Sequence, residues 1–416
     1  MKRRIIFHID VNSAYLSWEA AYRLQQGESL DIRTIPAVIG GDPQTRHGIV
    51  LAKSIPTKKY DIKTGETLYS ALSKCPNLLI VRPNYLLFRQ CSEALRDVLK
   101  EYSPTIQQFS IDEYFLDYTA MENLFGEPLQ AAHTIKERVK KELGFTVNIG
   151  ISTNKLLAKI SSDFQKPDKV HTLFPEEIPT KMWPLPVEDL FLVGSATTRK
   201  LHARNIHTIG ELAGTDPLYL RSFLKSHGLL IWNYAHGREN SPVRPGAIPI
   251  KGIGNSTTTS FDVEDLHEAH LVLLSLVETM CTRLRHKGYL AQLVAVSFRT
   301  NEFLNYSHQR KLSFSTDSTN EIWEIACQLL DELWQGQPLR HLGVRVGELC
   351  QNDFIQPAFF VRDRVKERKI DRAIDEIRER FGAQAIIRSS YLHSGLKPIA
   401  GGVITEEEYP MMTSIL

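Results

Sequence analysis

The sequence lacks a long apolar run, a clear excess of charge of either sign and a set of closely spaced cysteines. No run approaches the roughly 18 apolar residues of a membrane span, and the N-terminus enters a strand-like segment instead of a signal sequence. The five cysteines show neither a CxxC pair nor a disulfide-scaffold spacing, so we expect them to be reduced. These absences favour a cytoplasmic protein over a membrane or disulfide-rich secreted one.

What is present indicates an ordinary globular chain. Its 416 residues, of which 42% are hydrophobic, predict two to four domains, and we expect a monomer. A net charge of +2 gives no reason to expect nucleic acid, but basic residues gather in one stretch. They are Arg199, Lys200, Arg204, Arg221, Lys225, Arg238, Arg244 and Lys251. This stretch is compatible with contacts to a phosphate backbone and equally with a solvated face.

Hydrophobic periodicity in the first part of the chain predicts the order strand, helix, strand, strand, helix, strand. The predicted elements cover residues 5–10, 85–102, 105–111, 114–118, 129–143 and 146–151. This order is the ferredoxin-like βαββαβ motif, interrupted after its first strand by an insertion that ends near Pro83.

The same order recurs near the C-terminus. Its predicted elements cover residues 256–261, 266–286, 290–298, 310–314, 320–334 and 342–346. The region between the two units has a helical pattern bounded by prolines, and a charged helix is expected over residues 362–381.

Three acidic residues fall at related points of the first unit. Right-handed crossovers place strand 3 of a ferredoxin-like sheet between strands 1 and 2, so the end of strand 1 lies beside the hairpin joining strands 2 and 3. Asp10 ends strand 1, and Asp112 and Glu113 occupy the hairpin. Each alone is more often an ordinary strand end or turn, but together they predict carboxylates at one edge.

Clustered carboxylates repel one another unless cations or pKa shifts compensate, so this edge is a candidate divalent-metal site. Oxygen ligands favour magnesium or manganese over zinc. Two ions suit phosphoryl transfer, because one activates the attacking hydroxyl and the other holds the triphosphate and its leaving group. We therefore expect two Mg²⁺ ions, with Mn²⁺ as a substitute.

Three motifs resemble those of the Y-family DNA polymerases, in the order and spacing of the bacterial polymerase IV and polymerase V group. They are residues 9–15, residues 110–113, and residues 150–159 followed by Lys166 and Pro167. The resemblance covers nearly the whole chain but does not decide between the two kinships.

The resemblance implies an α+β, multidomain right-hand polymerase. It implies a ferredoxin-like βαββαβ palm at residues 1–12 and 76–165 with small fingers at residues 13–75. A helical thumb with a helix-hairpin-helix would follow at residues 166–240, then a βαββαβ little finger at 241–350 and a clamp-binding helical tail at 351–416.

The resemblance also assigns roles to individual residues. Asp10, Asp112, Glu113 and the backbone carbonyl of Val11 become metal ligands. Tyr15 becomes the steric gate against ribose, the alternative being a tyrosine that packs between fingers and palm. Ala14 departs from the aromatic residue common before the gate, which predicts a less supported ring and looser sugar discrimination.

Two lysines, Lys58 and Lys166, match positions that contact the triphosphate in the family. Either one alone is more often a solvated surface charge. Ile55 stands where many relatives have a phosphate-contacting tyrosine, so part of that grip is missing or comes from elsewhere.

The thumb and the tail carry two weaker motifs. Gly194, Ser195 and Lys200 fall in a segment that resembles a helix-hairpin-helix, whose backbone N–H groups bind DNA phosphates. Leu192 and Asn205 occupy positions that are usually glycine, which leaves a purely structural helical pair open. In the tail, Gln356, Phe359 and Phe360 resemble a sliding-clamp peptide, or else the two aromatics pack on the following helix.

These features predict a template-directed, error-prone translesion DNA polymerase without proofreading, which serves damage tolerance and binds primer-template DNA and dNTPs. Two other functions share parts of the pattern: a DNA-binding relative that has lost catalysis, and a nucleotide cyclase. Retention of all three acidic residues argues against the first. The long C-terminal half with its hairpin-like thumb argues against the second, because a cyclase has no use for a duplex grip.

Overall fold

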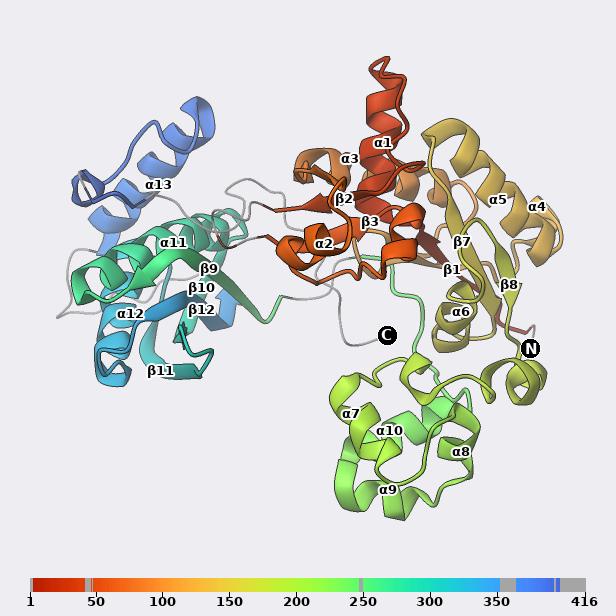
Figure 1. Cartoon of the computed structure of the whole chain (residues 1–416). Helices are drawn as coiled ribbons and strands as arrows, with labels where there is room; N and C mark the ends of the chain where they lie inside the picture. Colours follow the sequence, from red (N-terminus) through yellow and green to blue (C-terminus); the bar gives the residue numbers. More distant parts are fainter. Residues whose placement is uncertain are drawn as a thin grey trace. The chain divides into compact units, whose positions relative to one another are not determined.

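The computed structural model describes residues 3–41, 46, 48–246, 250–351, 364–392 and 394–396. The chain divides into two compact units, made mainly of residues 1–41 with 49–247 and of residues 248–408 (Figure 1). None of the described helices is both long enough and apolar enough to cross a membrane. All five cysteines are free, as the sequence predicts.

The first unit contains a five-stranded sheet with the order β5-β6-β1-β7-β8. Its strands are β1 (Ile6–Val11), β5 (Ile106–Gln108), β6 (Glu113–Asp117), β7 (Val147–Ser152) and β8 (Val170–Thr172). Strand β6 pairs antiparallel with both β1 and β5, and β7 pairs antiparallel with β1 on its other side. The predicted ferredoxin-like order is therefore confirmed, with β8 added parallel to β7.

Helices cover both faces of this sheet (Figure 1). They are α1 (Ala14–Gln25), α3 (Tyr85–Lys100), α4 (Glu122–Phe125), α5 (Pro128–Leu143) and α6 (Lys155–Ser162). Because side chains alternate along a strand, Phe7 and Ile9 join the core shared with α1, α3 and α5, while Ile6 joins a core with Leu156 of α6. Asp10 and His8 share the face that Ile6 occupies.

Helix α6 lies unusually close to the sheet because β7 carries a glycine there. A Cβ atom on Gly150 would lie 2.0 Å from the backbone oxygen of Ala158 and 2.5 Å from the backbone nitrogen of Ser162. Only glycine permits this approach, so Gly150 sets the height of α6 above the strands.

The insertion after β1 forms a small sheet of its own with the order β3-β2-β4. Its elements are β2 (Ala37–Gly40), β3 (Val50–Lys53), the 3₁₀ helix η2 (Ile55–Tyr60), α2 (Leu68–Lys74) and β4 (Leu79–Val81). The region that follows β8 is helical, as predicted. Its α-helices are α7 (Ser195–His202), α8 (Ile209–Gly214), α9 (Pro217–Leu224) and α10 (Ser226–Ala235).

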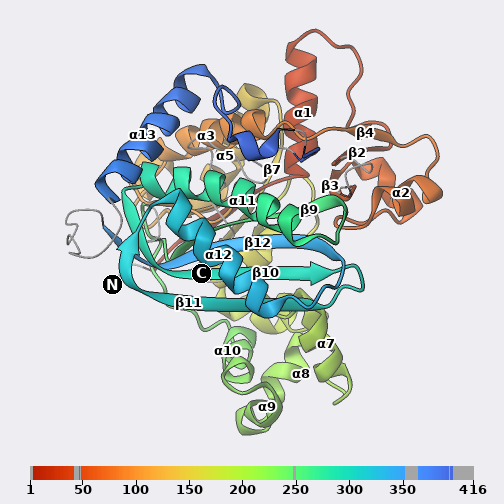
Figure 2. The ribbon, with the colours of Figure 1, turned by 90° about the vertical axis from the view of Figure 1, so that its left-hand side faces the viewer.

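The second unit has the predicted element order, with two helices across one face of a four-stranded sheet (Figure 2). The elements are β9 (Gly252–Val263), α11 (Leu266–His286), β10 (Tyr289–Thr300), β11 (Asn305–Thr316), α12 (Thr319–Leu333) and β12 (Leu339–Gln351). The order in the sheet is β11-β10-β12-β9, so β12 lies between β9 and β10. In the first unit the corresponding central strand is the third one.

The burial of the two strands explains this difference. Strand β12 contributes Leu342, Val344 and Val346 to the core, whereas the first half of β11 is mainly polar and exposed. A mainly polar strand is tolerated at a sheet edge, where charged side chains also discourage unwanted pairing. The apolar strand therefore takes the central place.

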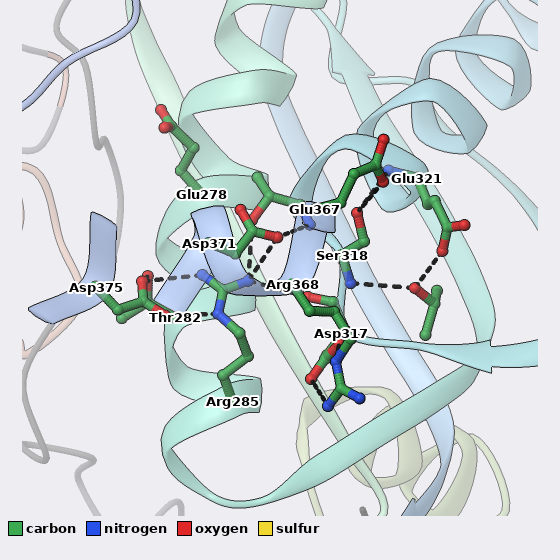
Figure 3. Close-up of polar contacts among 12 residues, drawn as sticks. Glu278, Thr282, Arg285, Asp317, Ser318, Glu321, Glu367, Arg368, Asp371 and Asp375 are labelled. Atoms are coloured by element: carbon green, nitrogen blue, oxygen red, sulfur yellow. Dashed lines mark hydrogen bonds and ion pairs between the residues drawn. The ribbon is translucent and has the colours of Figure 1, made fainter. Parts of the chain in front are cut away.

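The C-terminal helix α13 (Arg364–Phe381) packs on α11 through charged side chains. Arg285 donates to both carboxylate oxygens of Asp375, at 2.5 and 2.9 Å, and lies 3.5 Å from Asp371 (Figure 3). Asp371 and Asp375 are 6% and 7% exposed, whereas Ile370 and Phe381 of the same helix are 50% and 68% exposed. The buried face of α13 is thus ionic rather than apolar.

Candidate active site

The backbone of the first sheet brings the three predicted carboxylate residues together. Asp10 and Glu113 are direct partners in the antiparallel pairing of β1 and β6. The Val11 N–H donates to the Asp112 carbonyl oxygen at 3.1 Å, which fixes the hairpin against the end of β1. The sequence-based expectation that these residues meet at one edge is therefore met in the backbone.

Each of the three carboxylates already has a polar partner. Lys166 donates to Asp10, and Lys159 of α6 donates to Glu113. The Ser110 hydroxyl donates to the carboxylate of Asp112 at 2.5 Å. The two ammonium groups therefore offset the negative charge of Asp10 and Glu113 where the acidic side chains lie close together.

The pKa values of the cluster reflect burial first and the neighbouring charges second. Burial raises the pKa of Asp10 to about 6; Lys166 opposes the rise and Glu113 adds to it. Burial also raises the pKa of Asp112, the Ser110 hydroxyl opposes the rise, and Asp10 adds to it. For Lys166, burial lowers the pKa, but the carboxylates of Asp10 and Asp163 outweigh burial and raise it above its ordinary value.

The donor set fits a hard divalent cation in its chemistry. Carboxylate oxygens are the ligands that such ions prefer, and each cation would offset the burial and the repulsion that together raise the carboxyl pKa values. Among the residues that the structure describes, however, no group of three or more acidic, histidine or cysteine side chains is arranged for joint coordination. The carboxylates must therefore leave their lysine and serine partners to share an ion.

His8 lies on the same face of β1 as Asp10 and is fully buried. Its Nδ1 is 2.7 Å from the Ser162 hydroxyl oxygen, and its Nε2 is 4.0 Å from a carboxylate oxygen of Glu113. Burial lowers the pKa of His8 well below its ordinary value, and Lys159 and Lys166 add to that decrease. The ring therefore stays neutral beside the cluster at neutral pH.

Tyr15 lies in the first turn of α1. Its ring stacks on Phe88 of α3 with a centroid distance of 4.6 Å and an interplanar angle of 14°. Trp18 lies at a tilted angle with its centroid 5.9 Å away. Burial, with a contribution from Asp112, raises the pKa of Tyr15 to about 12. Phe88 thus supports the ring although Ala14 is not aromatic.

The second predicted lysine, Lys58, lies exposed in η2. Its neighbour Ile55 is 53% exposed at the beginning of the same 3₁₀ helix. No hydrogen bond that the structure describes joins Lys58 to Asp10, Asp112 or Glu113. The structure therefore brings Lys166 to the carboxylates and leaves Lys58 on the surface of the insertion.

The predicted helix-hairpin-helix has the expected local conformation. Gly194 is the N-cap of α7, and Ser195 and Lys200 are exposed on that helix. Leu192 and Asn205, which replace the usual glycines, have φ angles of 71° and 56°. Both positions therefore keep the left-handed backbone that glycine favours. The clamp-like residues Gln356, Phe359 and Phe360 lie outside the described residues.

Sequence reasoning did not single out Lys159 or Phe88. Lys159 stands in the motif of residues 150–159, and only the packing of α6 on Gly150 shows that it reaches Glu113. Phe88 belongs to the apolar face of α3, and periodicity cannot tell which buried ring meets Tyr15. The only signal for Lys159 was its place in that motif, and Phe88 carried none beyond its place in an amphipathic helix.

Comparisons with known proteins agree with this fold and site. The model of the impB/mucB/samB family matches residues 9–163, its C-terminal domain matches residues 250–359, and the IMS family HHH motif matches residues 175–206. The DNA polymerase IV of Clostridium acetobutylicum is 46% identical over 94% of this chain and 98% of its own. The DNA polymerase IV 2 of Bacillus subtilis is 36% identical over 94% and 95%, respectively.

Solved structures share the fold. A Y-family DNA polymerase chimera superposes with a TM-score of 0.73 at 21% identity, covering 84% of this chain and all of the other. The chain therefore belongs to the impB/mucB/samB family of Y-family polymerases and is a DNA-directed DNA polymerase. Within that class its curated relatives are DNA polymerases IV, the kinship that the motifs alone left open. Y-family DNA polymerases use divalent metal ions.

Proposed function

We propose that this chain carries out error-prone translesion synthesis, adding dNTPs to a primer 3′-hydroxyl opposite damaged bases without proofreading, in SOS-type damage tolerance. The observation that carries the proposal is the pairing of Asp10 with Glu113 beside Asp112 in a chain that is a polymerase of this family. The cyclase loses its support because the family match covers both halves of the chain. The inactive relative loses its support because the similar curated proteins are DNA polymerases IV.

The proposed ligands are the carboxylates of Asp10, Asp112 and Glu113 with the carbonyl oxygen of Val11, and the proposed ions are two Mg²⁺. Bound there, these ions would neutralise the triphosphate and favour the ionised primer hydroxyl. The burial that raises the pKa of Asp10 and Asp112 makes each carboxylate gain from a nearby cation. Lys166, which holds Asp10, is then released as a cation for phosphate oxygens.

The remaining residues of the proposed site select and grip substrates. Tyr15, held by Phe88, packs where a ribose 2′-hydroxyl would project. Lys58 contacts the triphosphate from the insertion. Gly194, Ser195 and Lys200 bind a DNA phosphate, a role that the left-handed Leu192 and Asn205 support. Related polymerases have been solved as ternary complexes, one of them an insertion complex, and we infer primer-template and dNTP binding here.

Asp112→Ala and Glu113→Ala test the proposal. Each should abolish primer extension on a damaged template in Mg²⁺, because each removes a proposed ligand while leaving the apolar core intact. Asp117→Asn, in the same strand but paired with Ile6 at its far end, is the matched control and should extend normally. Near-normal extension by either alanine variant would overturn the site.

The clamp-binding role of the tail has a separate test. A sliding clamp should stimulate primer extension by the wild type but not by a Phe359→Ala/Phe360→Ala variant.

A further inference from the structure

Asn148 is a fully buried polar residue directly across from Asp10. It lies in β7, is 0% exposed, and is the antiparallel partner of Asp10 in the pairing of β1 with β7. A buried amide costs free energy unless its hydrogen bonds are made, so its partners show what it is for.

The Asn148 side chain uses its full hydrogen-bonding capacity on one small region. Its Nδ2 donates to the backbone oxygens of Ser162 at 2.9 Å and Phe164 at 3.4 Å, where α6 ends. Its Oδ1 accepts from the backbone N–H of Lys169 at 3.2 Å and from the side chain of Asn12 at 3.3 Å. Because these backbone partners are a carbonyl on one side and an N–H on the other, the orientation of the amide is fixed.

Asn12 extends this contact to Asp168, inside the same loop. Its Oδ1 accepts from the backbone N–H of Asp168 at 2.7 Å, while its Nδ2 donates to Asn148. The two amides therefore bind the chain before, within and after residues 165–168. Gln165 and Asp168 have φ angles of 37° and 59°, a backbone conformation that residues other than glycine rarely adopt. The loop thus depends on outside contacts for its shape.

Lys166 lies at the centre of this loop, and its ammonium group reaches Asp10. A lysine places its charge accurately only if its backbone is fixed, because its side chain has four rotatable bonds. Lys136 and Lys140 hold the Asp168 carboxylate at 2.8 and 2.9 Å, but they fix that side chain rather than the backbone around Lys166. The buried amides instead bond the loop backbone on both sides of Lys166, beside the sheet hydrogen bond that the Ile149 N–H donates to the Lys169 carbonyl oxygen at 2.9 Å.

We propose that Asn148, with Asn12, is a positioning residue for Lys166 and so sets the affinity for the incoming nucleoside triphosphate. The inference rests on the proposed role of Lys166 in binding phosphate. Asn148 itself touches neither substrate nor a carboxylate. Its loss should therefore raise the KM for dNTP while kcat at saturating dNTP falls much less.

The test is steady-state single-nucleotide insertion at saturating Mg²⁺ by Asn148→Ala, Lys166→Ala and the double variant. Lys166→Ala should raise the KM for dNTP about tenfold, as loss of a charge-assisted contact predicts. Asn148→Ala should raise it about fivefold in the wild-type background and less than twofold when Lys166 is already alanine. Ser92→Ala is the control, since this buried hydroxyl bonds Tyr114 instead of the loop and should leave the KM unchanged.

The outcomes separate the two ideas. If Lys166→Ala leaves the KM unchanged, the proposed phosphate role fails and this inference fails with it. If Lys166→Ala raises the KM but Asn148→Ala does not, or if the two effects multiply fully in the double variant, only the positioning role is overturned. If Asn148→Ala does not fold, Asn12→Ala replaces it in the same experiment, because this change breaks the bond to Asp168 with less loss of buried structure. A smaller effect of Asn12→Ala on the KM in the Lys166→Ala background supports the proposal, and an equal effect overturns it.

Discussion

Phe88→Leu should weaken discrimination between dNTP and rNTP, although Phe88 acts only through its contact with Tyr15. The ring of Phe88 is fully buried and stacks on Tyr15 at 4.6 Å, and Tyr85 and Trp18 contact its other sides. Leucine keeps the site apolar but removes the flat surface against which the Tyr15 ring lies. The proposed gate then gains rotational freedom and excludes a 2′-hydroxyl less strictly.

The size of the effect follows from the stacking geometry. An aromatic pair contributes about 0.5–1.5 kcal/mol beyond the burial of its area. If all of this free energy holds the gate in place, the ratio of kcat/KM for dNTP over rNTP should fall by about 2- to 12-fold. Tyr15→Ala should reduce the ratio further, because it removes the gate itself.

The assay is single-nucleotide insertion with each sugar by the wild type and the variants. Phe145→Leu is the matched control, since Phe145 contacts Trp18 edge-on at 6.2 Å and belongs to the same core. It should lower stability without changing the ratio. If Phe88→Leu reduces kcat/KM for both sugars equally, the stack does not support a gate and the reasoning is wrong.

Three other perturbations test separate parts of the molecule. Gly150→Ala should lower extension about 100-fold with the fold retained by circular dichroism, because the new Cβ forces α6 away from the sheet that carries the carboxylates; near-normal extension would contradict the packing argument. Arg285→Met should speed amide hydrogen exchange of α13 about 100-fold or more, because leaving two buried carboxylates without their cation should destabilise the helix by about 3–5 kcal/mol. Arg310→Met removes a more exposed ion pair and should not change this exchange. Primer-template affinity should fall steeply and linearly on a log scale with salt, and a flat response would exclude phosphate contacts.

Topology explains why the centre of the site was predictable from the sequence. Asp10 and Glu113 are 103 positions apart, yet a ferredoxin-like order leaves only one place for the strand that follows the hairpin. The order of elements was visible in hydrophobic periodicity, and the crossover rule then fixed which ends meet. No side-chain detail was needed for that step.

The same rule did not extend to the second unit, and the reason is physical. Its element order is identical, but strand order in a sheet is chosen by burial as well as by crossover handedness. The exposed His308 and Gln309 suit β11 to the edge, and the apolar residues of β12 suit it to the centre. Likewise, the contact of Lys159 with Glu113 depends on the height of α6, which a single glycine determines.

Departures from the family pattern lose much of their weight once the local structure is known. Leu192 and Asn205 replace glycines of the hairpin, but both remain at positive φ. The surrounding contacts therefore compensate for the backbone strain that glycine would have avoided. The hairpin that presents the N-terminus of α7 is therefore preserved in shape. Ala14 follows the same logic, because the support that an aromatic neighbour would give Tyr15 comes from Phe88 in another helix. What must persist for function is the conformation or the contact, and a sequence motif is only one way to encode it.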